Sequence, residues 1–324
     1  MRFNGEGGYN NARFTADMIR AAATDLWQKH PDKKLIVVTD GWVAYRGPSV
    51  LTYPDDKHRI AGEAAGSLFL LAMDNDEIAE KAVRDIVAAG GKYVPVVVGL
   101  ASYHHHNFVW RKAAHEESMY QRDHGYTYWD MGDFDNLAQA IEITKHLDGS
   151  YVEVGTFRGS SGGAALCYMQ AAKMKRNCFF FDVFEGFDYE AAKESADAIW
   201  FGTHKTEGMD AVANRLTRFR SDLLNVTVER RNIITDQIPE SVGRIAVINI
   251  DVDIYEGILA GLEKCAPRML PGGIIILEDV GHTPGLIGAK VALEDFKATN
   301  LGKQFTGIYM ASGQYWLLKK EGGG

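Results

Sequence analysis

The sequence predicts an α/β protein whose larger part is a doubly wound, mostly parallel sheet of the Rossmann-like type. Three observations predict this fold class. Short β-branched or aromatic runs alternate with segments of helical periodicity, a glycine-rich turn joins one strand to the next helix, and acidic residues close several strands. We expect residues 1–125 to form a smaller accessory α/β domain and residues 126–320 to form the main domain.

The first hundred residues alternate helical and extended patterns. Apolar residues recur at helical spacing from Phe14 to His30, and the β-branched run from Lys34 to Thr39 ends at Asp40. The pattern then predicts a strand, a helix and a strand, in the order Ser67 to Met73, Asp76 to Ala89 and Tyr93 to Leu100. From Ala101 to Asp130 the composition turns polar and aromatic and the periodicity weakens, so the domain junction is placed there.

The second part of the chain has the regular alternation that is typical of a parallel sheet. The predicted strands are Tyr151 to Val154, Asn177 to Asp182, Val226 to Arg230, Ile245 to Ile250 and Gly273 to Leu277. The predicted helices are Asn136 to Leu147, Ser161 to Lys173 and Gly257 to Ala266. Two final runs, Gly307 to Met310 and Gln314 to Leu318, flank a short turn and predict an antiparallel hairpin at one edge.

A glycine-rich loop, Gly155 to Gly162, follows the strand that ends at Val154. Ligands bind at the carboxyl ends of strands in doubly wound sheets, and glycines let the backbone approach them closely. A dinucleotide site would read GxGxxG, whereas this loop reads GTFRGSSG. Glu153, just before the loop, suits the cationic cofactor S-adenosylmethionine, whose ammonium and sulfonium groups gain from nearby carboxylate charge. The expected loop contacts to this cofactor are Gly155, Thr156, Phe157, Gly159 and Ser160.

Asp182 ends the next strand, at the position where doubly wound folds hold an acid for ribose hydroxyls. It therefore supports the same cofactor at a second strand end. We predict that S-adenosylmethionine binds with its ribose at Asp182 and its amino acid end near Glu153 and Gly155.

Further acids close two later strands. Asp251 and Asp253 follow one strand, and Glu278 and Asp279 follow the next. Carboxylates brought to one edge of a sheet repel each other unless a cation lies among them, and oxygen ligands suit Mg²⁺. Such an ion could hold an acceptor hydroxyl and lower its pKa. The alternative for Asp253 and Glu278 is a solvated or helix-capping role.

From about Trp129 onward, the chain resembles the macrocin O-methyltransferase family, which methylates sugar hydroxyls on glycosylated natural products. The resemblance rests on the segments 131–137 (MGDFDNL), 152–159 (VEVGTFRG), 182–187 (DVFEGF), 233–239, 250–256 (IDVDIYE) and 270–279 (LPGGIIILED). It implies that residues 126–320 are an S-adenosylmethionine-dependent methyltransferase domain. The resemblance does not reach the N-terminal part.

The resemblance also implies roles for individual residues. The family's acids at the matching positions are similar to metal ligands, which implies Asp251, Glu278 and Asp279, with Asp251 also catalytic. Glu278 stands where the family has an aspartate. A histidine after the DSFEG-like segment acts as base in the family, which implies His204, whose imidazole titrates near neutrality and could accept a hydroxyl proton. The alternative is a solvated surface histidine.

Composition narrows the partners and the compartment. The net charge of −8 provides no basic field for nucleic acid or anionic lipid. No apolar stretch approaches the roughly 20 residues that span a bilayer. The three cysteines form no CxxC pair, which suits a reducing cytoplasm. We expect a cytoplasmic homo-oligomer that acts on a small-molecule, glycoside substrate and has no membrane or nucleic acid partner.

Three interpretations of function stay open at this point. The leading one is Mg²⁺-dependent O-methylation of a sugar or glycosylated small molecule. The second is methylation of a catechol-like phenol, because the same acids would hold two neighbouring oxygens. The third is a cofactor-binding scaffold with the active piece in the N-terminal domain. The run His104 to His106 in that domain is expected to be solvated, since adjacent side chains do not converge on one ion.

Overall fold

A computed structural model describes residues 14–41, 45, 49–96, 103–195, 197, 200–282 and 285–321. The chain divides into two compact units, Met1–His115 and Glu116–Gly324, and each is described by itself. Helix α5 (Phe108–Asp123) runs through the point of division. The accessory role of residues 1–125 and the boundary after residue 125 stay predictions.

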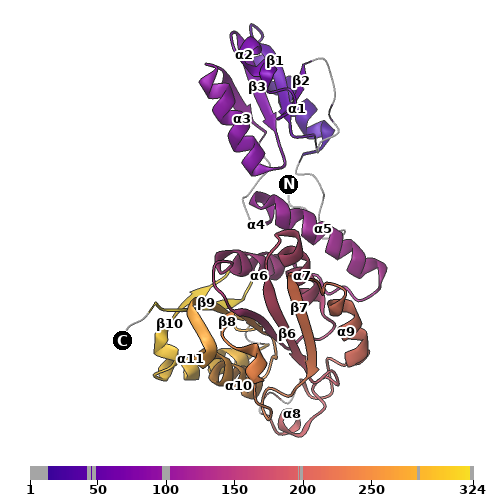
Figure 1. Ribbon diagram of the computed structural model, residues 1–324, viewed down its shortest axis with the longest axis vertical. Helices are drawn as coiled ribbons and strands as arrows, with labels where there is room; N and C mark the ends of the chain where they lie inside the picture. Colours follow the sequence, from indigo (N-terminus) through magenta and orange to yellow (C-terminus); the bar gives the residue numbers. More distant parts are fainter. Residues whose placement is uncertain are drawn as a thin grey trace. The chain divides into compact units, whose positions relative to one another are not determined.

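The first unit contains a parallel sheet in the order β2-β1-β3-β4, drawn in indigo and purple in Figure 1. Its elements are α1 (Ala16–Lys29), β1 (Lys34–Thr39), β2 (Val50–Thr52), α2 (His58–Glu63), β3 (Ser67–Ala72), α3 (Asp76–Ala88), β4 (Lys92–Pro95) and α4 (Tyr103–His106). Strand alternation turns Ile36 and Val38 toward one apolar cluster, with Ile86 of α3. Val37 turns to the opposite face, into a cluster with Ile19 of α1. The sheet is therefore covered by a helix on each face.

Two sequence interpretations for this region differ from the structure. The weak periodicity from Ala101 to Asp130 led to no predicted helix in the segment where the domain junction was placed. Among its described residues, Tyr103–His106 form α4 and Phe108–Asp123 form α5. The strand expected from Tyr93 to Leu100 is described as β4, Lys92–Pro95, and residues 97–100 lie outside the described residues.

The second unit is built on a seven-stranded sheet in the order β10-β11-β9-β8-β5-β6-β7 (Figure 1). Its main elements are α6 (Met131–Ile143), β5 (Ser150–Val154), α7 (Ser160–Ala171), β6 (Arg176–Asp182), α8 (Glu190–Glu194), α9 (Met209–Thr217), β7 (Leu224–Arg230), β8 (Ile245–Ile250), α10 (Tyr255–Cys265), β9 (Met269–Leu277), α11 (Ile287–Ala298), β10 (Phe305–Tyr309) and β11 (Tyr315–Lys319). Strand β11 runs antiparallel to β9 and β10, and the other neighbouring pairs are parallel. The predicted α/β fold class, with its edge hairpin, is confirmed.

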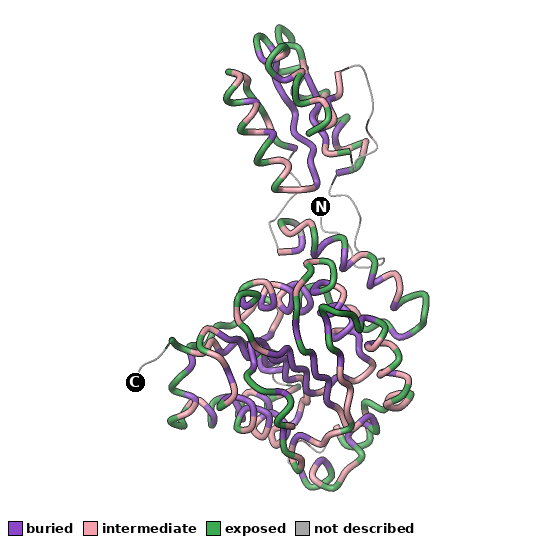
Figure 2. Tube along the Cα trace, viewed as in Figure 1, coloured by how far each residue is buried: buried purple, intermediate pink, exposed green. Residues whose placement is uncertain are grey.

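The core of this unit lies on both faces of the central strands. All residues of β5 and β8 are buried, and Figure 2 shows these strands in purple behind helices of mixed exposure. Ile248 and Ile275 face a large apolar cluster that includes Leu262 of α10 and Phe296 of α11. On the opposite face, Phe180 packs closely against Gly162 of α7. Burial on both faces explains why β8 is an almost continuous apolar run.

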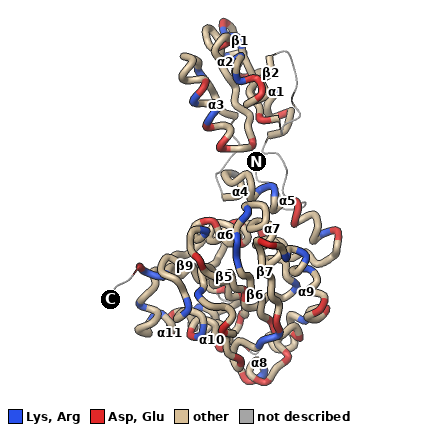
Figure 3. The backbone as a smooth tube through the Cα atoms, in the orientation of Figure 1, with Lys and Arg blue, Asp and Glu red and all other residues tan. Residues whose placement is uncertain are grey.

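Charged residues of both signs are spread over the helices and loops of both units (Figure 3). Within the described part of the chain, no helix has the length and apolar character needed to span a membrane.

The sheet topology positions the functional region. From β5 the chain moves outward through β6 and β7 and then returns to β8 on the other side of β5. Ligands of such folds bind at this change of direction, beyond the carboxyl ends of the strands. Gly155 follows β5 at φ +90°, and a Cβ there would lie 1.6 Å from the backbone oxygen of Asp251. Only glycine therefore lets the two strand ends approach this closely.

We predict that Gly155→Ala destabilises the protein more than Gly125→Ala does. Both glycines have positive φ, but a Cβ at Gly125 meets no atom within 4 Å. The control loses about 1–2 kcal/mol for a left-handed L-residue. The clash at residue 155 adds about 1–3 kcal/mol of overpacking. Urea unfolding of both variants measures the difference, and equal losses would contradict the close approach.

Candidate functional site

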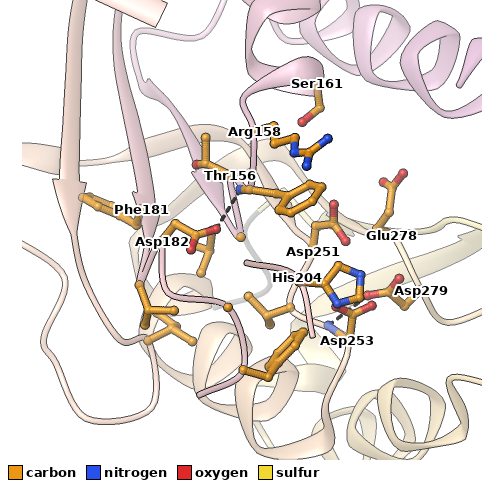
Figure 4. A pocket seen from close by; sticks show the side chains of 18 of the residues that line it. Thr156, Arg158, Ser161, Phe181, Asp182, His204, Asp251, Asp253, Glu278 and Asp279 are labelled. Carbon is orange, nitrogen blue, oxygen red and sulfur yellow. Dashed lines mark hydrogen bonds between the residues drawn. The ribbon is translucent and has the colours of Figure 1, made fainter. Parts of the chain in front are cut away.

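A cavity of about 430 Å³ lies at the carboxyl edge of the second unit's sheet, where the strand order reverses (Figure 4). The predicted residues that line it are Gly155, Thr156, Phe157, Ser160, Asp182, His204, Asp251, Glu278 and Asp279. Glu153 and Gly159 lie next to these residues in the chain but do not line the cavity. The topology thus brings most of the predicted site residues to one place.

The loop between β5 and α7 is held in place by its own backbone. The N–H of Gly155 donates to the carbonyl of Phe181 at 2.9 Å, and Gly159 caps α7 in a left-handed conformation. Phe157 also has a positive φ of 47°. The hydroxyl of Thr156 is buried and has no hydrogen-bond partner among the described residues. This loop therefore brings a buried, unsatisfied polar group to the cavity, which ordinarily requires a partner.

Asp182 lies at the end of β6 and faces the loop (Figure 4). One carboxylate oxygen accepts the N–H of Phe157 at 2.7 Å, and the other accepts the N–H of Phe184 at 2.6 Å. Burial raises the pKa of this carboxyl, and the backbone hydrogen bonds oppose that shift. Each oxygen keeps a lone pair, so both can accept a further hydrogen bond from a ligand hydroxyl.

Glu153 lies beneath the loop and is fully buried. Its carboxylate accepts hydrogen bonds from the hydroxyls of Tyr151 at 2.8 Å and Ser161 at 3.1 Å. Burial raises the pKa of Glu153 to about 7, although both hydrogen bonds act in the opposite direction. Its link to the cavity runs through Ser161, which lines the wall. Direct contact between Glu153 and a cofactor stays a prediction.

Three aspartates meet at the ends of β8 and β9. One oxygen each from Asp251, Asp253 and Asp279 lies within 4.8 Å of the other two. Burial raises the pKa of Asp251 well above its usual range, and the charges of Asp279 and Glu278 raise it further. Three oxygens from separate carboxylates, close together and short of solvent, form a donor set that suits a hard divalent cation.

Asp253 was not among the predicted metal ligands, and its capping or solvated role had been left open. Its backbone N–H donates to Asp279 at 3.1 Å, and its φ of 55° lies in the left-handed region. That conformation turns the chain back at Asp253 and brings its carboxylate to the other two. β8 ends at Ile250, so strand alternation does not explain this pairing, and the left-handed turn that produces it has no signature in the sequence.

Glu278 lines the cavity but lies outside the three-oxygen group. Its carboxylate accepts a hydrogen bond from the Gln314 side chain at 2.5 Å. Burial raises the pKa of Glu278 well above its usual range, and neighbouring Asp133 raises it further. Its ligation of a metal stays a prediction. The partners Asp133 and Gln314 come from α6 and from the turn before β11, two segments that the sequence did not connect with the site.

His204 is exposed and lines the cavity. Three aromatic rings surround its imidazole, with centroid distances of 5.6 Å to Phe157, 5.5 Å to Phe187 and 5.7 Å to Trp200. Its φ of 59° is left-handed. Figure 4 shows the ring on the side of the cavity where Asp253 and Asp279 lie. His204 is therefore exposed but lies beside the acidic group at the cavity wall, and its catalytic role stays a prediction.

The sequence analysis missed several lining residues, among them Tyr128, Arg158, Arg231 and His282. His282 follows Asp279 by three residues, and its Nε2 lies 3.2 Å from the carbonyl oxygen of Ser312. Proximity to the predicted acids was the available signal for His282. No local pattern marks Tyr128 or Arg231, because only the folded sheet brings them to the cavity.

Several known proteins with similar sequence or structure are methyltransferases. The 8-demethyl-8-(2,3-dimethoxy-alpha-L-rhamnosyl)-tetracenomycin-C 4'-O-methyltransferase of Streptomyces olivaceus is 29% identical over 153 residues, which cover 45% of this chain and 59% of that protein. The chain thus spans about three fifths of the length of this curated relative. The O-methyltransferase NovP has a TM-score of 0.51 and 18% identity over 65% of this chain and 90% of its own. The calicheamicin methyltransferase CalS11 has a TM-score of 0.51 and 16% identity over 63% of this chain and 84% of its own.

At these identities the two solved structures establish the fold, which is that of Rossmann-like methyltransferases. The family comparison goes further, because it covers more than half of the chain and agrees with the motifs in the sequence. Residues 96–316 match the macrocin-O-methyltransferase (TylF) family, and the chain belongs to that family.

Proposed function

We propose that this protein transfers a methyl group from S-adenosylmethionine to a hydroxyl of a sugar or glycosylated small molecule, with Mg²⁺ as the metal. The observation that carries the proposal is one cavity bounded by both the glycine loop and the three-aspartate group. Membership of the macrocin-O-methyltransferase family supports the reaction. The name of the Streptomyces relative, a rhamnosyl 4'-O-methyltransferase, supports a sugar acceptor.

Features of the cavity wall fit S-adenosylmethionine. The oxygens of Asp182 retain lone pairs for the ribose hydroxyls, and the buried Thr156 hydroxyl requires a partner. Gly155 lines the cavity beside the proposed amino acid end, and Glu153 beneath it adds negative charge when ionised. These residues support binding with the ribose at Asp182 and the amino acid end near Glu153 and Gly155.

The acidic group fits Mg²⁺ by its donor chemistry, since it offers only carboxylate oxygens. Asp251, Asp253 and Asp279 would hold the ion. When bound, Mg²⁺ supplies a Lewis acid that lowers the pKa of an acceptor hydroxyl. Glu278, held by Gln314, contributes negative charge from the adjoining wall when it is ionised.

The chain's own residues then have two tasks. Methyl transfer depends mainly on holding the acceptor oxygen in line with the methyl carbon, and the cavity walls restrict that geometry. His204 beside the acidic group accepts the hydroxyl proton. We further propose that residues 1–125 have an accessory role and that the protein works as a cytoplasmic homo-oligomer.

A catechol-like phenol is a second candidate acceptor, favoured by the aromatic rings of Phe157, Phe187 and Trp200 at the cavity. The three aspartates would hold two neighbouring phenol oxygens as readily as two sugar hydroxyls. Purified protein assayed with Mg²⁺, a panel of glycosides and a panel of catechols separates the two. Methylation of catechols alone would end the sugar proposal.

We predict that Asp182→Ala weakens S-adenosylmethionine binding by roughly 10- to 150-fold, as expected for the loss of charge-assisted hydrogen bonds. Titration calorimetry measures the affinity, and circular dichroism confirms that the variant is folded. Asp222→Ala, at an exposed acid outside the cavity, is the control and should bind normally. Unchanged affinity in folded Asp182→Ala would remove Asp182 from the binding site.

We predict that turnover collapses in chelator and returns with Mg²⁺. Asp251→Asn and Asp279→Asn should lower kcat by roughly 100-fold or more, because the ion supplies several kcal/mol of stabilisation. Cofactor affinity should stay nearly intact, since Asp182 and the glycine loop hold the cofactor. Glu278→Gln should be milder, because Glu278 lies outside the three-oxygen group. Full activity of metal-free enzyme in excess chelator would exclude the metal from the reaction.

We also predict that Asp251→Asn raises the thermal stability of the metal-free protein at neutral pH. An acid whose folded-state pKa is raised contributes stability below its unfolded pKa, and that stability is lost as pH rises through the folded pKa. Asparagine avoids this loss of stability. The Tm of Asp251→Asn should therefore exceed that of the natural protein near pH 8, and the gap should shrink toward pH 4. Thermal unfolding in chelator measures it, with exposed Asp222→Asn as the control.

Added Mg²⁺ should then raise the Tm of the natural protein and not that of Asp251→Asn, because a ligand stabilises only the state that binds it. Identical Tm values for the two proteins across this pH range would show that the buried charge of Asp251 carries no penalty.

A further inference from the structure

We propose that Thr203 is a positioning residue that fixes the tautomer of His204, so that Nε2 is the ring nitrogen with the available lone pair. The inference rests on the proposed role of His204 as proton acceptor. It adds a second residue to that role and states which ring atom receives the proton.

The proton assignment follows from two hydrogen bonds at one hydroxyl. Thr203 Oγ1 lies 2.6 Å from the carbonyl oxygen of Trp200 and 2.8 Å from Nδ1 of His204. A threonine hydroxyl has a single hydrogen, and a carbonyl oxygen only accepts. The Thr203 hydrogen must therefore lie in the bond to Trp200. Nδ1 supplies the hydrogen of the second bond, which leaves the lone pair of the neutral ring on Nε2.

The backbone around Thr203 holds this arrangement. Its N–H donates to the Trp200 carbonyl at 3.0 Å, and its carbonyl accepts the N–H of Phe187 at 3.0 Å. Gly186 approaches so closely that a Cβ there would lie 2.1 Å from the Thr203 carbonyl oxygen. Backbone hydrogen bonds to Trp200 and Phe187 thus hold Thr203 in place. His204 follows Thr203 with a left-handed φ and lines the cavity.

The same hydrogen bond serves both protonation states of the ring. Nδ1 donates to Thr203 when the imidazole is neutral, and it still donates once Nε2 has gained a proton. When the acceptor O–H bond breaks, its proton passes to Nε2, and the oxygen electron pair forms the bond to the methyl carbon. The carbon–sulfur bond breaks with its electron pair going to sulfur. The hydrogen bond between His204 Nδ1 and Thr203 therefore stays in place throughout this step.

The rings around His204 limit the alternatives. Phe157, Phe187 and Trp200 surround the imidazole and offer no hydrogen-bond acceptor on their ring faces that equals a hydroxyl oxygen. A ring flipped by half a turn would lose the Thr203 bond. Thr203 therefore selects both the tautomer and the ring orientation.

The test compares Thr203→Val, which removes the hydroxyl and keeps the side-chain shape, with Thr203→Ser, which restores it. We expect Thr203→Val to lower kcat roughly 3- to 10-fold, as for one lost hydrogen bond, with an unchanged KM for S-adenosylmethionine. Thr203→Ser should recover the rate. Thr206→Val is the matched control, because the Thr206 hydroxyl binds Phe184 and Gly208 in the same loop but not His204.

Nitrogen NMR of ¹⁵N-histidine-labelled protein reads the tautomer directly. The His204 signals are assigned by comparison with His204→Gln. The natural protein should show a protonated Nδ1 and an unprotonated Nε2, and Thr203→Val should show a mixture. If the uncharged His204 ring of the natural protein carried its proton on Nε2, the inference would be overturned, whatever the enzyme methylates.

A double variant separates this inference from the proposed function. In a His204→Ala background, Thr203→Val should have no further effect on kcat if Thr203 acts through His204. An equal rate loss in both backgrounds would show that Thr203 acts by another route and would overturn its positioning role. Failure of the natural protein to methylate any glycoside would instead reject the proposed function, while the NMR result would still decide the tautomer.

Discussion

The mutual repulsion of carboxylates at the carboxyl edge of the sheet is the constraint on which this site depends. Asp279 is buried and Asp251 is half-buried at the cavity wall, and loss of solvent together with neighbouring charge raises the pKa of both groups. Such an arrangement lowers stability in isolation. It persists because the strands beneath it are held by a dense apolar core, and because a cation would convert the repulsion into attraction. The fold is therefore destabilised at the place where the reaction is proposed to occur.

The sheet supplies the rigidity that this arrangement needs. Gly155 and Asp251 follow adjacent parallel strands, and the absence of a Cβ at Gly155 lets the two strand ends touch. Asp182 bonds the backbone of the same loop from the next strand. The loop after β5 and the acidic group are therefore coupled through a close backbone contact at Gly155, and the Asp182 carboxylate ties the same loop to the next strand. A shift at either would move the other, which suits a reaction whose rate depends on alignment.

The sequence predicted the strand ends well, because each depends on a local pattern. Apolar runs that stop at an acid identified Asp182, Asp251 and Asp279, and parallel topology brought them to one edge. Asp253 and Glu278 were harder, because their positions depend on a left-handed residue and on Gln314 from a distant segment. Neither a backbone dihedral angle nor a long-range partner leaves a recognisable pattern in a short stretch of sequence.

Helix α5 was missed for a different physical reason. Its buried face is mixed: Trp110, Ala113 and Ala114 are buried, and so are Glu117 and Gln121. The Gln121 side chain donates to the carbonyl of Ser160 at 2.9 Å, and Glu117 pairs with Arg218, so a buried charge is compensated. Buried polar residues interrupt the apolar period, which weakens the hydrophobic periodicity of the helix. The same network reaches the first residue of α7, so the segment that was taken as a junction supports the cofactor loop.

The electrostatics of the cavity also explain why a neutral hydroxyl would orient His204. In many sites a carboxylate holds the second ring nitrogen of a catalytic histidine. Here Asp182 and Asp253 already act on His204 through their charge, since a protonated imidazole lowers the pKa of both. Another carboxylate would add repulsion to an acidic region. The Thr203 hydroxyl fixes the same geometry without adding that charge.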